Sequence, residues 1–227
     1  MSCDRASVDH SANTDTYGLL VAAEWLSGLF IAPLSQQQVM DLSAVPGKNA
    51  LQWIGAQLGA PAVAQQLCHI LEQDTPENLT IRLQRRYTAL FEGIFRNRSV
   101  MPYEGAWCGQ SPSLGEQSVA EMKAILRDLD LHVSSDCCEP ADHLAIELAA
   151  LVAALGSDRY SIAADLVRRL QRWSPAFAEA LERQDLEGFY AGAGKLLLAL
   201  LRTAQPVLLM TNHAATSVNE QCEGELA

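Results

Sequence analysis

Hydrophobic residues recur along most of the chain at the three- and four-residue spacing of amphipathic helices, and no segment shows the convincing alternation of a strand. The first stripe lies over 17–31 and consists of Leu19, Ala22, Ala23, Leu26, Leu29 and Phe30. Pro33 ends this helix, because proline cannot donate the backbone hydrogen bond that would continue it. Ser35 with Gln38 then forms a capping box, which opens a short second helix.

A long helix follows two shorter ones, which the spacing predicts over 48–58 and 61–73. It starts at Asp74-Thr75-Pro76, where proline takes the first helical position. Its apolar face is Leu83, Tyr87, Leu90, Phe91, Ile94 and Phe95. A proline-containing loop comes next, and a second capping box at Ser113 and Glu116 opens another helix.

The C-terminal half is predicted to hold four further helices. Glu139-Pro140 opens the first, which runs to about Leu155. The others are predicted over about 158–172, 174–183 and 185–203, with Ser174-Pro175 as a start signal. The last helix carries the stripe Leu186, Phe189, Tyr190, Ala193, Leu197, Leu200 and Leu201.

Together these elements predict an all-α protein with a single compact domain of about nine to ten helices over 15–204. Both ends of the chain are polar and rich in small residues. We therefore expect a flexible N-terminal segment over 1–14 and a disordered acidic tail over 205–227.

Composition narrows the function. Hydrophobic residues make up 49% of the chain, and the formal net charge is −11. Such acidity excludes a typical nucleic-acid-binding domain, because phosphate binding needs clustered Lys and Arg. No apolar stretch is long enough to span a membrane and no secretory signal is visible, so a cytoplasmic protein is expected. The cysteines show no C-x-x-C pattern.

Motifs for catalysis are largely missing, since there is no Gly-rich phosphate loop and no G-x-S-x-G element. One polar cluster stands out: Glu139, Asp142, His143 and Glu147. Glu139, His143 and Glu147 lie four residues apart, so they are predicted to share one helix face. Three interpretations stay open: helix capping with surface polarity, peptide binding, and a metal site.

A second candidate site is an aromatic group that consists of Tyr87, Phe91, Tyr103 and Trp107. Such residues commonly line binding grooves, but they also fill an ordinary hydrophobic core. Five arginines lie in the same helix and loop: Arg82, Arg85, Arg86, Arg96 and Arg98. They form either a site that binds an anion or a solvent-exposed helix face. From Glu104 to Glu147 there are nine acidic residues against Lys123 and Arg127, so a basic ligand would be attracted there.

The order of these motifs resembles the TorD/DmsD family of redox-enzyme maturation chaperones, which is related to NarJ, and it is most similar to the TorD branch. The resemblance covers about 17–203 and rests on ordered segments: Tyr87-x-x-Leu90-Phe91, Pro102-Tyr103-Glu104-Gly105-Ala106-Trp107, Gly115-Glu116, Leu131-His132-Val133, Glu139-Pro140-Ala141-Asp142-His143-Leu144 and Gly188-Phe189-Tyr190.

The resemblance implies an all-helical cytoplasmic chaperone and not an enzyme. Its partners would be the twin-arginine signal peptide and the apo catalytic subunit of a molybdenum oxidoreductase of the DMSO or TMAO reductase class. Such a chaperone delays export and aids insertion of the cofactor. The resemblance implies no tightly bound cofactor. It does imply transient contact with molybdopterin guanine dinucleotide or weak binding of GTP. The protein would be a monomer, and some family members form domain-swapped dimers.

The resemblance also places the family's peptide-binding motif on Tyr87, Leu90, Phe91, Pro102, Tyr103, Pro140, Asp142 and His143. To these predicted site residues the charge and the aromatic pattern add Glu104, Trp107 and Glu139. The apolar part of the peptide is expected on the aromatic residues. Arg86 stands where the family often has an acid, so the acidic role is expected on Glu104, Asp142 and Glu139. His143 would make affinity sensitive to pH near its usual range. The competing hypotheses are a metal-dependent enzyme that uses Glu139, His143 and Glu147, and a general helical adaptor.

Overall fold

Helices dominate the computed structural model, which describes residues 5–93, 99–108, 112–133 and 138–224, with side chains over 16–93, 99–108, 115–133 and 138–209. Within these residues there are nine α-helices, one short 3₁₀ helix and no strand, which confirms the all-α prediction. The elements are α1 (Arg5–Ile31), α2 (Gln36–Ser43), α3 (Val45–Gln57), α4 (Pro61–Leu71), α5 (Pro76–Phe91), η1 (Glu104–Ala106), α6 (Pro112–Asp128), α7 (Leu144–Gly156), α8 (Tyr160–Gln184) and α9 (Phe189–Gly224).

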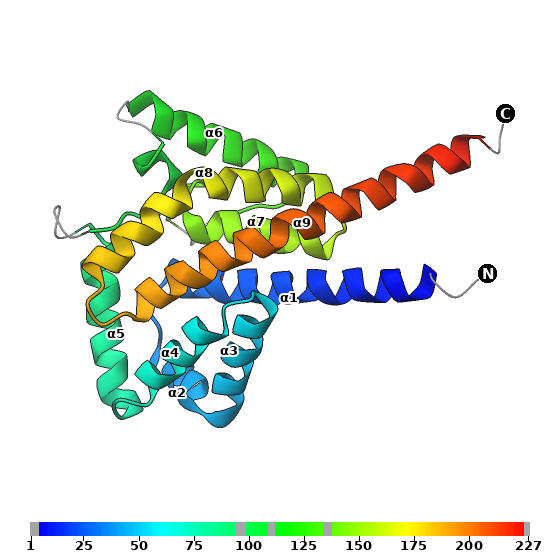
Figure 1. Cartoon of the computed structure of the whole chain (residues 1–227). Coiled ribbons are helices and arrows are strands. Elements are labelled where there is room, and N and C mark those ends of the chain that lie inside the picture. Colours follow the sequence, from blue (N-terminus) through cyan, green and yellow to red (C-terminus); the bar gives the residue numbers. More distant parts are fainter. Residues whose placement is uncertain (1–4, 94–98, 109–111, 134–137, 225–227) are drawn as a thin grey trace.

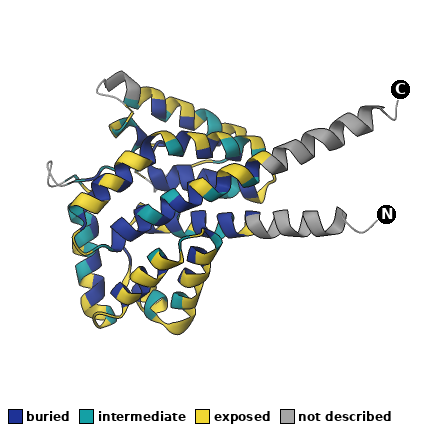
Figure 2. Ribbon diagram, in the orientation of Figure 1, coloured by how far each residue is buried: buried dark blue, intermediate teal, exposed yellow. Residues whose placement is uncertain are grey.

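The core lies where α1, α7, α8 and α9 pack against one another, while α2, α3 and α4 form a small group beneath α1 (Figure 1). Buried positions line the facing sides of these helices (Figure 2). Nearly every predicted stripe residue with a described side chain is buried, from Leu19 in α1 to Leu201 in α9. One continuous hydrophobic cluster therefore joins α1 to α9, as expected for a single domain.

Two of the predicted helices are one helix in the structure. The expected start at Ser174-Pro175 lies inside α8, which continues through Pro175. Trp173 and Phe177 are buried on either side of it, and this packing outweighs the lost backbone hydrogen bond. The helix changes direction along its length in Figure 1, as an internal proline commonly causes.

Other helix boundaries also differ from the predicted ones. α7 begins at Leu144 and not at Pro140, because His143 caps it, and α9 begins at Phe189 after a turn at Gly188, which has a φ of 82°. Leu186 lies in that turn and is 90% exposed, so its place in the apolar stripe was wrong.

The terminal helices extend into both segments that the sequence predicts to be flexible, since α1 begins at Arg5 and α9 ends at Gly224. Leu208 is 1% exposed, so the core continues past the predicted domain end at 204. Flexibility of the outermost residues stays a prediction. No helix among the described residues is long and apolar enough to cross a membrane.

Candidate functional site

Two loops that are far apart in the sequence are joined by a short antiparallel bridge between Tyr103 and His143. The Glu104 N–H donates to the Asp142 carbonyl at 3.0 Å, and the Leu144 N–H donates to the Pro102 carbonyl at 2.8 Å. The motif before η1 and the motif before α7 therefore form one unit. This unit brings together most of the residues that the resemblance assigns to peptide binding.

His143 is the N-cap of α7 and not a residue within it. Its Nδ1 accepts a hydrogen bond from the Ala145 N–H at 3.1 Å, and its ring packs edge-on against the Tyr103 ring with centroids 5.1 Å apart. Burial lowers the pKa of His143 to about 4, against the opposing charge of Glu139. The ring is therefore neutral at pH 7, and it does not titrate near the usual range that we expected.

Asp142 and Glu104 both face inward, with exposures of 3% and 2%. The Asp142 Oδ2 accepts a hydrogen bond from the Gly105 N–H at 3.0 Å. Gly105 is required here, because a Cβ on it would lie 2.7 Å from the Cα of Gly115 in α6. η1 thus packs directly on α6.

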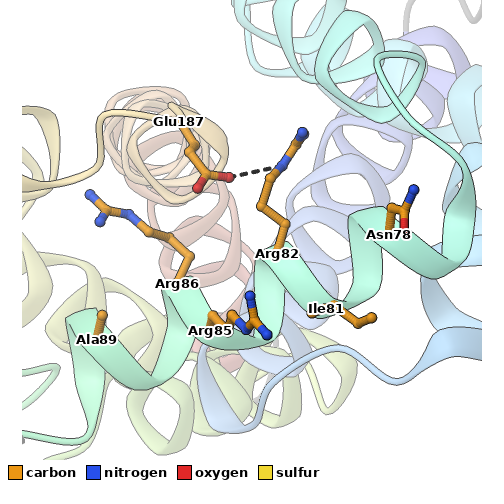
Figure 3. Close-up of a pocket in the computed structure, with 7 residues that line it drawn as sticks. All are labelled: Asn78, Ile81, Arg82, Arg85, Arg86, Ala89 and Glu187. Carbon is orange, nitrogen blue, oxygen red and sulfur yellow. Dashed lines mark ion pairs between the residues drawn. The ribbon is translucent and has the colours of Figure 1, made fainter.

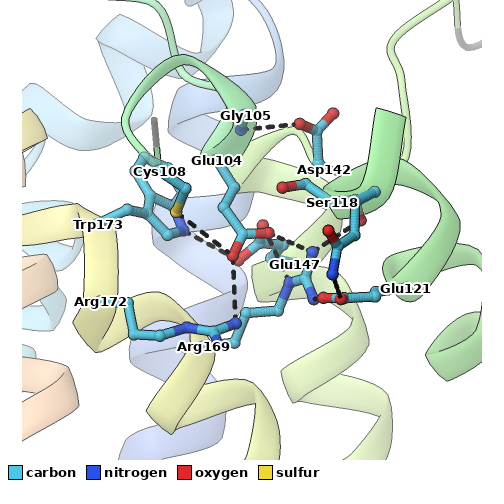
Figure 4. Close-up of polar contacts among 11 residues, drawn as sticks. Glu104, Gly105, Cys108, Ser118, Glu121, Asp142, Glu147, Arg169, Arg172 and Trp173 are labelled. Carbon is cyan, nitrogen blue, oxygen red and sulfur yellow. Dashed lines mark hydrogen bonds and ion pairs between the residues drawn. The ribbon is translucent and has the colours of Figure 1, made fainter. Parts of the chain in front are cut away.

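Glu104 belongs to a buried ionic network centred on Arg169 of α8 (Figure 4). Arg169 pairs with Glu104, with Glu121 at 2.9 Å and with Glu147 at 3.7 Å, and its Nη2 donates to the Ser118 carbonyl at 2.7 Å. The network connects η1, α6, α7 and α8.

Burial raises the pKa of both inner carboxyls in this network, and for the fully buried Glu147 it raises the pKa well above the usual value. The Trp173 indole N–H also donates to Glu147, at 3.4 Å. Arg172 adds a second, more exposed cation, 3.3 Å from Glu104. The carboxylates of Glu104 and Glu147 are therefore committed to internal partners.

The metal hypothesis depends on a helix face that does not exist. Glu139 precedes α7, His143 caps it, and Glu147 points into the Arg169 network. Among the described residues, no group of three His, Cys, Asp or Glu side chains could hold a metal ion. The predicted shared face of Glu139, His143 and Glu147 was wrong.

The motif aromatic residues of α5 belong mainly to the core. Tyr87 is 6% exposed and donates its hydroxyl hydrogen to the Phe30 carbonyl at 2.9 Å, and Leu90 and Phe91 are buried beside it. Trp107 is half-buried, and its indole N–H donates to the Met101 carbonyl at 2.8 Å. These side chains therefore support the site from the core, and little of their surface is exposed to a ligand.

A pocket of about 370 Å³ opens at the bridge, between the end of α1, the end of α5 and the two joined loops. We call it the acidic pocket. Its lining residues are Ile31, Ala32, Pro33, Tyr87, Phe91, Glu92, Met101, Pro102, Tyr103, Glu139 and His143. Six of the predicted site residues line it, namely Tyr87, Phe91, Pro102, Tyr103, Glu139 and His143. The other five do not: Leu90, Glu104, Trp107, Pro140 and Asp142.

Two carboxylates, from Glu92 and Glu139, give the acidic pocket its charge. The Tyr103 hydroxyl donates to the Glu139 Oε2 at 2.7 Å, and burial together with this bond raises the pKa of Tyr103. Within the described part of the chain, neither glutamate forms an ion pair. Sequence reasoning missed Glu92, although its place directly after Phe91 at the end of α5 was a usable signal.

The arginine cluster of α5 lies in a separate groove of about 580 Å³ (Figure 3). Arg82 pairs with Glu187 at 2.9 Å and Arg86 with the buried Asp185 at 2.9 Å. The turn between α8 and α9 thus neutralises two of the three described arginines, which leaves Arg85 exposed. Arg96 and Arg98 lie outside the described residues. These two ion pairs hold α5 against that turn, and the positive charge left in the groove is small.

Comparison with known proteins gives the family. The sequence profile of the nitrate reductase delta subunit family matches residues 56–186, which is more than half of the chain. The chain therefore belongs to the nitrate reductase delta subunit family, and the resemblance to its TorD/DmsD and NarJ-related members is confirmed.

Individual relatives carry a more particular name. The Chaperone protein TorD of Vibrio atlanticus is 27% identical over 191 residues, which cover 78% of this chain and 88% of that protein. The Chaperone protein TorD of Vibrio parahaemolyticus is 26% identical over 198 residues, 82% of this chain and 92% of that protein. The one from Salmonella paratyphi B is 27% identical over 189 residues, 78% and 85%.

Proposed function

We propose that this protein is a cytoplasmic maturation chaperone, not an enzyme, that binds the twin-arginine signal peptide and the apo catalytic subunit of a molybdenum oxidoreductase. Its relatives named Chaperone protein TorD match over most of their length and most of this chain, which supports a chaperone of the same kind. The observation that carries the peptide role is the acidic pocket, where five other predicted site residues line the same cavity as Glu139 and Glu92, two carboxylates without ion-pair partners among the described residues.

The pocket suits arginine side chains. A carboxylate can bind a guanidinium through two parallel hydrogen bonds, which makes the contact geometrically specific. Glu92 and Glu139 take this role more readily than Glu104 and Asp142, because the latter two are buried against internal partners. The neutral ring of His143 adds no positive charge that would repel the peptide.

Charge supplies only part of the affinity. Each arginine–carboxylate pair at such a rim contributes about 0–1 kcal/mol. Ordering and immobilising a peptide costs about 4–15 kcal/mol, so apolar contacts must provide most of the binding free energy. The two pocket glutamates should therefore select the arginine-containing peptide, while an apolar surface close to them holds it.

The test is fluorescence anisotropy with a labelled synthetic peptide that carries two consecutive arginines followed by an apolar stretch. Glu92→Gln with Glu139→Gln should weaken binding about twofold to thirtyfold, the range for two exposed ion pairs of roughly 0.2–1 kcal/mol each. Glu116→Gln changes an exposed glutamate on α6 outside the pocket and serves as the control, with no change expected.

Replacing both peptide arginines with glutamine should mimic the double variant and add nothing to it, because the same contact is removed from either side. An additive loss would place the arginines elsewhere on the chaperone. The general adaptor hypothesis predicts no response of the wild-type protein to an isolated signal peptide, and that result would overturn the proposal.

A further inference from the structure

A second pocket, of about 310 Å³, lies directly beside the acidic pocket. It opens between the end of α1, the first half of α7 and the segment after α6. We call it the apolar pocket, and its lining includes Ile31, Leu131, Val133, Ala145, Ile146 and Ala149. Among the described residues that line it, none is acidic and none is Lys or Arg, and the polar ones are Ser27 and His132. Ile31 lines both pockets, so they meet at that side chain.

The far side of the apolar pocket is charged in the opposite sense. The segment Leu131-His132-Val133 also lines a third pocket, where Lys123 and Arg127 of α6 are found. Along this surface the order is therefore acidic, apolar and basic. A basic-then-apolar peptide has one favourable direction on such a surface, because its arginines would be repelled by Lys123 and Arg127.

The apolar pocket also exposes large hydrophobic side chains at the surface. Ile31 is 36% exposed and Val133 39%, so both present apolar surface to solvent. Exposed apolar patches with polar rims commonly mark binding sites. The glutamates on one side and the cations on the other form such a rim.

We propose that the apolar pocket binds the apolar stretch of the signal peptide, in a single direction set by the flanking charges. The arginines lie on Glu92 and Glu139, and the chain then runs past Ile31 along α7 toward Val133. This inference rests on the proposed function and adds the second half of its site.

The spacing between the two pockets limits which peptides fit. From His143 at the acidic pocket to Ala149 in the apolar pocket, α7 rises about 9 Å. An extended peptide covers that distance in about three residues at roughly 3.3 Å each, and a helical one in about six. The arginines and the apolar stretch must therefore be near neighbours in the peptide.

The experiment uses the full-length protein with two neutral changes at exposed positions, Val133→Ser and Ala149→Gln. Neither change alters the charge of the acidic pocket. The probe is the labelled peptide with two arginines and an adjoining apolar stretch, and the control is Val45→Ser, at a residue 67% exposed on α3. Anisotropy should show affinity falling roughly tenfold in the double variant, since apolar contact is lost and polar groups must be desolvated. The control should bind like wild type.

A second measurement tests the direction. A photo-crosslinking residue at the far end of the apolar stretch should attach near Val133, and one beside the arginines should attach near Glu92 or Glu139. The reverse pattern overturns the proposed direction. Unchanged affinity in the double variant overturns the apolar pocket while leaving the proposed function intact. Absence of binding by the wild-type protein overturns both.

Discussion

His143 offers the sharpest test of the site, because its burial links folding to pH. The change is His143→Asn, which keeps a residue that caps helices well but removes the titrating ring. The structure gives the ring 2% exposure and a hydrogen bond from the Ala145 N–H to its Nδ1, a bond that only the form with an unprotonated Nδ1 can accept. Protonation therefore costs both solvation and the cap.

The size of the effect follows from the pKa of His143, which is about 4 in the folded protein and 6.5 in the unfolded reference. Between these values the unfolded state binds more protons, so stability falls as the pH falls from about 6.5 toward 4. The linkage amounts to a loss of about 2 kcal/mol between pH 7 and pH 5. At pH 7 and above the contribution is fully present.

The assay is urea denaturation followed by tryptophan fluorescence, at half-unit steps from pH 5 to pH 8, on wild type and His143→Asn. Glu104 and Glu147 have raised pKa values and act in the opposite sense, because the folded state then binds more protons and stability falls as the pH rises. They are present in both proteins, so the difference between the two curves isolates His143. The loss of the ring contact with Tyr103 adds a constant offset. Parallel curves would refute the reasoning, since they would mean that the ring titrates equally in both states.

Other substitutions test the packing around the site by the same denaturation assay. Gly105→Ser should lower the free energy of unfolding by about 1–3 kcal/mol, because its Cβ would lie 2.7 Å from the Gly115 Cα in α6. Gly115→Ala is the control and should lower it much less, since a Cβ there meets nothing within 4 Å. Equal losses would disprove the close contact. Arg169→Met leaves buried carboxylates unpaired and should lower the free energy of unfolding by about 3–5 kcal/mol. Arg168→Met, at an exposed arginine, should change it little. A neutral result for Arg169→Met would mean that the network contributes nothing to stability. Tyr87→Phe leaves a carbonyl of α1 unpaired and should cost about 1 kcal/mol, and no loss would argue against that hydrogen bond.

Much of the fold was predictable because helical periodicity is a local property. The stripe of α1 and the part of the α5 stripe from Leu83 to Phe91 are visible in the sequence and buried in the structure, while Ile94 and Phe95 lie outside the described residues. The errors occurred where tertiary packing outweighs local signals. Pro175 indicated a helix start, but Trp173 and Phe177 hold α8 continuous through it.

The site was less predictable from the residues alone. Motif resemblance assigned Tyr103 and His143 to one site, and the structure joins them. That Glu104 faces inward depends on Arg169, which is 65 positions further along the chain, and no local pattern links the two. The capping role of His143 was not predictable for the same reason. The turn at 139–143 depends on hydrogen bonds to the loop before η1, which is far away in the sequence.

The bridge between Tyr103 and His143 bears on how binding specificity would change under the proposed function. Two backbone hydrogen bonds and the Arg169 network hold both loops in place, so the pocket wall is preorganised. Under the proposed function, most of the entropy lost on binding would come from the peptide. Backbone hydrogen bonds do not depend on side-chain identity. Rim residues such as Glu92 can therefore diverge between relatives while the frame beneath them keeps its shape, which lets one scaffold acquire different specificities by surface substitution alone.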